Sequence, residues 1–145
     1  MDLGDILSKD QIITDLRASN RWEAIDELID NLVATGKIKT EDREAIAAVV
    51  KKRESSMSTG IGFGIGIPHA STDLIFEVVG ALGRSRQGVD FDALDNQRVN
   101  LVMLFLVPHS IIFSLDSCDA TFFNPVWMVT NPIRMDSEIS IMATR

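Results

Sequence analysis

Residues 58–71 read STGIGFGIGIPHAS, and the interpretation of the whole chain of 145 residues starts from them. Glycine occupies every second position from Gly60 to Gly66. In an extended strand this period places the glycines on one face and the isoleucine and phenylalanine side chains on the other. The apolar face would anchor the strand to a core, while the bare face would let a ligand or partner approach the backbone.

The stretch runs into Pro68 and His69, which suggests a histidine with a defined orientation. Proline fixes its own φ and favours an extended conformation at Ile67, so His69 is expected at a defined angle at a strand end. A neutral imidazole held in this way can attack a phosphoryl group and carry it as a phosphohistidine. On these residues alone, an ordinary loop histidine is the simpler alternative, and it stays open.

Phosphoryl transfer also needs a group that stabilises negative charge, and arginine and backbone N–H groups suit this role. Arg53 is the candidate, because the helix expected over residues 41–53 leads directly into the glycine stretch. Other chemistries fit less well. The glycines precede a Pro-His rather than a helix, unlike a dinucleotide fingerprint, and no P-loop is present. Two histidines and one cysteine are few for a metal site, so no metal is expected.

The composition is that of a soluble globular protein, with 46% hydrophobic and 24% charged residues, and the length indicates one domain. A net charge of -7 disfavours nucleic-acid binding, because such a surface repels phosphate backbones. No apolar run reaches the roughly 18–20 residues of a membrane span, and the acidic start MDLGDILSKD is unlike a signal peptide. We therefore expect a cytoplasmic location. The single cysteine, Cys118, excludes an internal disulfide and is expected to fill core space.

Two amphipathic helices are predicted early in the chain. An apolar stripe at i, i+3, i+4, i+7 spacing predicts the first helix over residues 20–36, with Asn20 as N-cap and Gly36 after its last turn. The members of this stripe are Ile25, Leu28, Ile29 and Leu32. The second helix is expected over residues 41–53, with Thr40 as its N-cap.

Strands are predicted after the glycine stretch, between residues 78 and 107. Residues 78–83 read as a strand, 84–88 as a polar turn and 89–92 as a short extended piece. Residues 99–107, VNLVMLFLV, form a nearly continuous apolar run that is typical of a central strand covered on both faces. Helices followed by strands predict an α/β or α+β domain, with a single sheet flanked by helices.

The motifs together resemble a known family. The chain contains Arg53-Glu54, then Ser58-Thr59-Gly60-Ile61-Gly62, and then Gly66-Ile67-Pro68-His69. In this order they resemble the signature of the mannitol/fructose-type IIA domains of the bacterial phosphotransferase system, a group that includes nitrogen-regulatory IIA proteins. The segment GVDFDALD before the apolar run adds to the resemblance, which covers residues 1 to about 108.

The resemblance implies a mixed β-sheet with helices on both sides and a phosphoryl carrier in residues 1–108. His69 would accept a phosphoryl group from the phosphohistidine of the small carrier HPr or its nitrogen-branch counterpart. It would pass the group to a cysteine of a IIB component in sugar uptake, or use it as a regulatory switch. Arg53 and Thr59 would bind the phosphate, and no metal or organic cofactor would be needed.

The chain departs from the family pattern after Pro108. Members of the family usually carry a second histidine on a helix after the central strand, whereas His109 follows Pro108 at once, and we expect it to be a loop residue at the strand end. No Leu/Ala-rich helix follows, so residues 109–145 are expected to be an atypical tail, and a frameshifted or replaced C-terminus is a hypothesis. Without its cover, the sheet would be less stable or would self-associate.

Two alternatives to a carrier stay open on the sequence. One is a regulatory binding module of the same fold, in which phosphorylation of His69 switches the partner that is bound. The other is a degenerate domain that no longer transfers phosphate because part of its site is missing.

Overall fold

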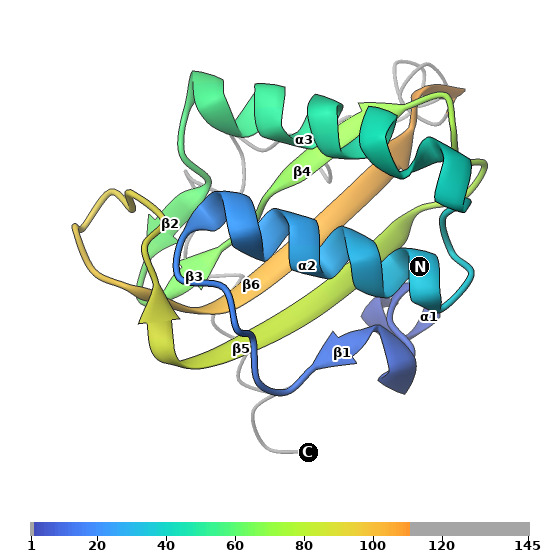
Figure 1. Ribbon diagram of the computed structural model, residues 1–145. Helices are drawn as coiled ribbons and strands as arrows, with labels where there is room; N and C mark the ends of the chain where they lie inside the picture. The colour runs from blue at the N-terminus through green and yellow to red at the C-terminus, as the bar shows by residue number, and fades with distance from the viewer. Residues whose placement is uncertain (1, 111–145) are drawn as a thin grey trace. The chain divides into compact units, whose positions relative to one another are not determined.

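The computed structural model describes residues 2–110, which form one mixed β-sheet with two long helices packed on it (Figure 1). The sheet has six strands in the order β1-β5-β6-β3-β2, and β4 also pairs with β6. The strands are β1 (Ile12–Ile13), β2 (Gly60–Gly62), β3 (Ile65–Gly66), β4 (His69–Thr72), β5 (Val79–Val89) and β6 (Val99–Pro108). The predicted mixed α/β class is confirmed. The expectations about the tail and Cys118 fall on residues 111–145 and lie outside the described residues.

The helical elements are short at the N-terminus and long where they cover the sheet. They are α1 (Leu3–Ile6), α2 (Arg21–Ala34), α3 (Arg43–Ser56) and the 3-10 turns η1 (Lys9–Gln11) and η2 (Thr40–Asp42). Figure 1 shows α2 and α3 lying across the same face of the sheet. The core lies between this pair of helices and the strands β4, β5 and β6.

Helix α2 follows its sequence prediction closely. The Asn20 side chain accepts hydrogen bonds from the backbone N–H groups of Trp22 and Glu23, each at 3.0 Å, as an N-cap does. After the last turn Gly36 takes a φ of 75°, and the Lys37 N–H donates to the carbonyl of Leu32 at 2.9 Å. The four apolar residues of the predicted stripe are fully buried.

Helix α3 begins later than predicted, and Thr40 is not its N-cap. Thr40 starts the 3-10 turn η2 instead, and Asp42 at the end of that turn already has helical backbone angles of φ -90° and ψ -9°. The chain therefore winds into α3 from a tighter turn rather than from an extended cap residue. The helix ends at Ser56, three residues beyond the predicted end, which keeps Arg53 inside its last turn.

The glycine stretch is a hairpin and not the single strand that its period predicts. Strands β2 and β3 pair antiparallel with Gly60 opposite Gly66, and the chain turns between them. Three successive residues, Gly62, Phe63 and Gly64, have φ values of 95°, 56° and 74°. This left-handed region favours glycine, so two of the four glycines serve the turn. Phe63 is 92% exposed and does not anchor the segment, contrary to expectation.

The other two glycines make room for protein and not for a ligand. A Cβ on Gly60 would lie 2.8 Å from the Cβ of Ala93 and 2.9 Å from its Cα. A Cβ on Gly66 would lie 3.1 Å from the ring of Phe91, which is fully buried. The predicted bare face is therefore filled by the segment that follows β5. Close packing, rather than access for a partner, accounts for these two glycines.

Strand β5 runs through the turn predicted at residues 84–88. It pairs antiparallel with β6, and the register shifts between Arg84 and Val89, so a bulge takes up the polar residues. Asn100 on β6 donates to the carbonyl of Ser85 at 2.9 Å, which satisfies the bulged backbone. The prediction of a turn at residues 84–88 is wrong, because hydrogen bonds from the neighbouring strand can hold polar residues inside a strand.

Strand β6 is the central strand that the apolar run predicts, and it extends to Pro108. Its side chains at Val102, Leu104 and Leu106 are fully buried on the face that α2 and α3 cover. Beside it, β3 and β4 follow one line, both parallel to β6, with a break at Ile67 and Pro68. Proline lacks the N–H that a continuous ladder needs, so the break falls at Pro68.

The packing of Gly60 generates a test. We expect Gly60→Ala to lower the free energy of unfolding by about 1–3 kcal/mol, because the added methyl group meets backbone as well as side-chain atoms. Gly4→Ala in α1 is the matched control, since no heavy atom lies within 4 Å of its Cβ position. This control should be neutral or stabilising by up to about 1 kcal/mol. Urea unfolding followed by circular dichroism measures both, and equal stabilities would contradict the packing argument.

Candidate functional site

His69 is the first residue of β4, and its backbone lies opposite Phe105 of β6. The side chain is half-buried, and its Nδ1 lies 2.9 Å from the carbonyl oxygen of Ile67. A carbonyl only accepts hydrogen bonds, so Nδ1 carries the proton in the neutral ring. The lone pair of the neutral imidazole is then on Nε2, which makes Nε2 the nucleophilic atom.

The surroundings of His69 favour this neutral form. Its pKa is lowered, mainly because burial disfavours the charged ring. The hydrogen bond to Ile67 and the charge of Glu54 oppose this change in pKa, while the positive charge of Arg53 adds to it. The net lowering keeps a larger fraction of the ring uncharged near neutral pH, as a nucleophile requires.

Arg53 reaches the same region from the last turn of α3. Its side chain is half-buried, and Nη1 donates to the carbonyl of Met57 at 3.2 Å. Its positive charge is one of the causes that lower the pKa of His69, so the guanidinium lies within electrostatic reach of the ring. The structure thus brings together the two residues that the sequence singles out, because α3 ends just before the hairpin that leads to β4.

Thr59 lies at the start of the hairpin and is almost completely buried. Its hydroxyl donates to Oε2 of Glu54 at 2.6 Å, and its backbone N–H donates to Oε1 at 3.0 Å. Thr59 was expected to bind phosphate, but its hydroxyl proton is directed at the carboxylate of Glu54. A direct contact between Thr59 and phosphate stays a prediction.

Glu54 is the residue that sequence reasoning missed, since it entered only as a letter of the signature. Its side chain is 1% exposed, and Oε1 lies 3.7 Å from Nη1 of Arg21, the first residue of α2. A buried carboxylate is costly unless it is hydrogen-bonded and paired, and Glu54 is both. A signal was present, because Glu54 follows the buried Val50 by four positions and so continues the apolar face of α3.

His109 does not join this group. Its Nδ1 lies 2.9 Å from Oδ1 of Asp73, in the segment after β4. The register pairs His69 with Phe105 and Thr72 with Pro108, so His109 lies beyond the far end of the β4–β6 pair. Four residues along a strand correspond to about 13 Å. His109 is not the loop residue that the sequence predicts, because residues 109–110 have helical backbone. That His109 takes no part in the site stays a prediction.

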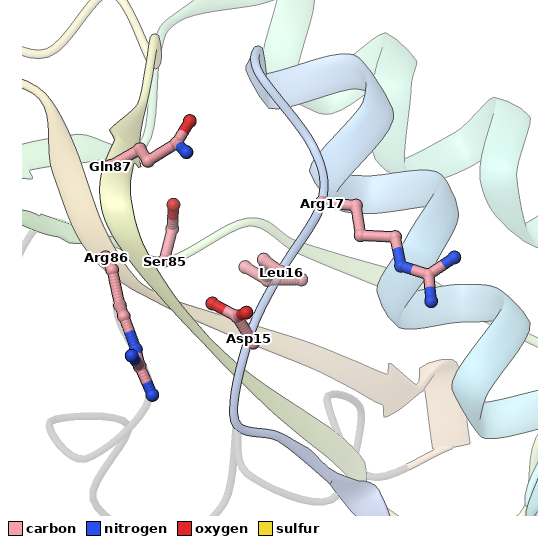
Figure 2. A pocket seen from close by; sticks show the side chains of 6 residues that line it. All are labelled: Asp15, Leu16, Arg17, Ser85, Arg86 and Gln87. Carbon is pink, nitrogen blue, oxygen red and sulfur yellow. The ribbon is translucent and has the colours of Figure 1, made fainter.

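A hollow of about 280 Å³ lies elsewhere, between the segment after β1 and the bulge of β5 (Figure 2). Backbone hydrogen bonds join these two segments at Leu16–Arg84 and again at Ser19–Asp90, and the bulge separates them in between. Its lining residues are Asp15, Leu16, Arg17, Ser85, Arg86 and Gln87. None of the predicted site residues lines it, and Figure 2 shows the Arg17 side chain directed away toward a helix.

Two further properties concern the described residues 2–110 alone. No group of three or more His, Cys, Asp or Glu side chains among them could hold a metal ion. No helix among them is both long and apolar enough to cross a membrane.

The chain is similar to known proteins over most of the described part. Residues 5–112 match the family described as phosphoenolpyruvate-dependent sugar phosphotransferase system, EIIA 2. A fructose-specific EIIA component from Haloferax volcanii is 37% identical over 107 residues, which are 74% of this chain and 68% of that protein. A fructose-specific EIIABC component from Bacillus subtilis is 38% identical over 104 residues, which are 72% of this chain but only 16% of that larger protein.

Solved structures show the same fold. The nitrogen regulatory protein IIA-Ntr from Neisseria meningitidis has a TM-score of 0.66 and 26% identity, with 92% of this chain and 88% of that chain covered. The IIA mannitol domain from Escherichia coli has a TM-score of 0.61 and 20% identity, with 83% and 85% covered. With the half-buried histidine beside an arginine and the match over residues 5–112, the chain belongs to the EIIA 2 family of the phosphoenolpyruvate-dependent sugar phosphotransferase system.

Proposed function

We propose that this protein is a phosphoryl carrier that accepts a phosphoryl group on Nε2 of His69. The observation that supports this is the hydrogen bond between Nδ1 and the carbonyl of Ile67, which leaves Nε2 with a free lone pair. In the reaction, Nε2 forms a bond to phosphorus as the bond from phosphorus to the donor's histidine nitrogen breaks. The donor we propose is the phosphohistidine of an HPr-like carrier, and the reaction needs no metal or organic cofactor.

Arg53 would stabilise the negative charge of the transferring group. Its positive charge already helps to lower the pKa of His69, and arginine is well suited to phosphate oxygens because it offers several N–H donors in one plane. Thr59 would contribute by shaping the segment before the hairpin, with its backbone and hydroxyl held by Glu54. Catalysis in phosphoryl transfer consists largely of such positioning and charge stabilisation.

The next acceptor decides between transport and regulation. A structure of enzyme IIA mannitol in complex with phosphorylated IIB mannitol has this fold, and relatives include fructose-specific components, which supports a IIB cysteine as acceptor. A nitrogen regulatory protein from Bradyrhizobium diazoefficiens is 27% identical over 108 residues, which supports a regulatory target instead. We propose a cytoplasmic IIA component for which both acceptors should be assayed.

The proposal predicts one labelled histidine. With phosphoenolpyruvate, enzyme I and HPr, the wild-type protein and His109→Ala should both gain an acid-labile, base-stable phosphate, and His69→Ala should gain none. His109 is a suitable control because it lies at the other end of β4. No labelling of the wild-type protein would overturn the carrier function and favour a domain without transfer activity.

The pH dependence of phosphorylation follows from the lowered pKa of His69. Only the neutral ring attacks, and the lowered pKa keeps the ring neutral below its ordinary value of 6.5. The rate of phosphorylation should therefore fall to half its maximum at a pH below 6.5. The midpoint of a titration of the ring by NMR should coincide with it. A midpoint above 6.5 would contradict this reading of the site.

Replacing Arg53 should have two separable effects. Arg53→Gln should slow phosphorylation by about 10²-fold, the usual cost of losing one charge-stabilising donor. It should also raise the midpoint of the His69 titration, because the positive charge of Arg53 lowers that pKa. Lys52→Gln removes a neighbouring exposed charge and is the matched control. If both variants slow the reaction equally, the effect belongs to the general charge of the surface and not to Arg53.

A further inference from the structure

We propose that Glu54 is a positioning residue for His69, which it orients through Thr59 and Ile67 rather than by touching the ring. The proposal deepens the proposed function, since it concerns how the acceptor histidine is held. It assigns to Glu54 the task of keeping the proton of the neutral ring on Nδ1. The nucleophilic nitrogen is thereby fixed before any phosphoryl donor arrives.

The first link joins α3 to the start of the hairpin. Both carboxylate oxygens of Glu54 accept hydrogen bonds from Thr59, Oε1 from its backbone N–H at 3.0 Å and Oε2 from its hydroxyl at 2.6 Å. Hydrogen bonds to a charged acceptor are stronger than neutral ones, and two of them to one residue fix its orientation. With Glu54 and Thr59 1% and 5% exposed, respectively, water does not compete for these contacts.

The second link runs from Thr59 to the imidazole along the backbone. The carbonyl of Thr59 accepts the N–H of Ile67 at 3.0 Å, and the carbonyl of Ile67 accepts from Nδ1 of His69 at 2.9 Å. Pro68 stands between Ile67 and His69, and its fixed φ leaves this segment little freedom to adjust. A displacement of Thr59 is therefore passed to the carbonyl that selects the tautomer.

The buried carboxylate of Glu54 has a positively charged neighbour. Nη1 of Arg21 lies 3.7 Å from Oε1 of Glu54, and the same Nη1 lies 3.8 Å from the exposed carboxylate of Asp92. Glu54 also acts on His69 through space, where its charge opposes that of its neighbour Arg53. Two adjacent residues of α3 thus influence the ring with opposite signs, while the hydrogen-bond chain sets the ring's direction.

The decisive variant is Glu54→Gln, which keeps the shape of the side chain. Its amide NH₂ can only donate, so the hydroxyl of Thr59 must turn round to accept from it, and both contacts lose the charged acceptor that makes them strong. Nitrogen-15 NMR of the imidazole reports the tautomer directly. We expect the wild-type ring to show a protonated Nδ1 and an unprotonated Nε2 above its titration midpoint, and Glu54→Gln to show a mixture and a lower midpoint.

Ser58→Ala is the matched control in the same loop. The Ser58 hydroxyl donates to the carbonyl of Phe91 at 2.6 Å and accepts from the N–H of Gly60 at 3.1 Å, but it is no part of the chain to His69. Ser58→Ala should lose stability and keep the single tautomer. A change of tautomer in Ser58→Ala as large as in Glu54→Gln would overturn the proposal, because a merely loosened loop would then explain both.

Thr59 supplies a second test should Glu54→Gln fail to fold. Thr59→Val removes the hydroxyl and keeps the backbone N–H, whereas Thr59→Ser keeps both donors. We expect mixed tautomers in Thr59→Val and the wild-type pattern in Thr59→Ser. If Thr59→Val, and Glu54→Gln where it folds, retain the single Nδ1-protonated tautomer, Ile67 alone holds the ring and the role of Glu54 is refuted.

This experiment is independent of phosphoryl transfer. It uses the unphosphorylated full chain with no carrier protein, so its result stands whether or not His69 is ever labelled. A wild-type protein that gains no phosphate would remove the proposed function and leave the tautomer result intact. If the protein is phosphorylated but Glu54→Gln and Thr59→Val leave the tautomer unchanged, the proposed function stands and the role of Glu54 is refuted.

Discussion

The contact between the buried carboxylate of Glu54 and Thr59 is the junction on which the candidate site depends. It is where the helical layer and the sheet are joined, because Glu54 ends the buried face of α3 and Thr59 begins the hairpin. Arg53 projects from the helical side of this junction, and His69 follows on the sheet side after β3 and Pro68. Without a fixed junction, the arginine and the histidine would belong to two elements that move separately.

The hairpin needs a second constraint, which is the close approach of its glycines to the segment after β5. Phe91 packs over Gly66 and Ala93 over Gly60, and the Leu94 N–H donates to the carbonyl of Gly60 at 3.0 Å. These contacts hold the outer edge of the short strand β2, which would otherwise be an exposed sheet edge. The burial of Phe91 thus supports the hairpin, and the hairpin in turn delivers Pro68 and His69 to the edge of β6.

Much of the fold could be predicted from the sequence, because helix stripes and apolar runs report directly on burial. Helix α2 and strand β6 were predicted to within a few residues for this reason. The hairpin could not be predicted in this way. Glycine at every second position is equally compatible with one long strand and with two short strands joined by a turn at Phe63. Arg53 and His69 were singled out as candidates through the order of the motifs. The burial of Glu54 could be inferred from its spacing to Val50, but its hydrogen bonds to Thr59 could not, because composition does not encode them.

The exposed apex of the hairpin also gives the molecule a convenient reference point. Phe63 points into solvent from a turn of three left-handed residues, and the N–H of Phe63 is held by Asp95 at 3.1 Å. The carbonyl of the next residue, Gly64, accepts a hydrogen bond from the N–H of Asn100 on β6. His69 lies opposite Phe105, five residues further along β6, so the hairpin apex and His69 are separated by about 17 Å along the strand. A spectroscopic label attached at position 63, in a chain whose natural Cys118 has been replaced, would therefore serve as a fixed origin for distance measurements to a docked protein.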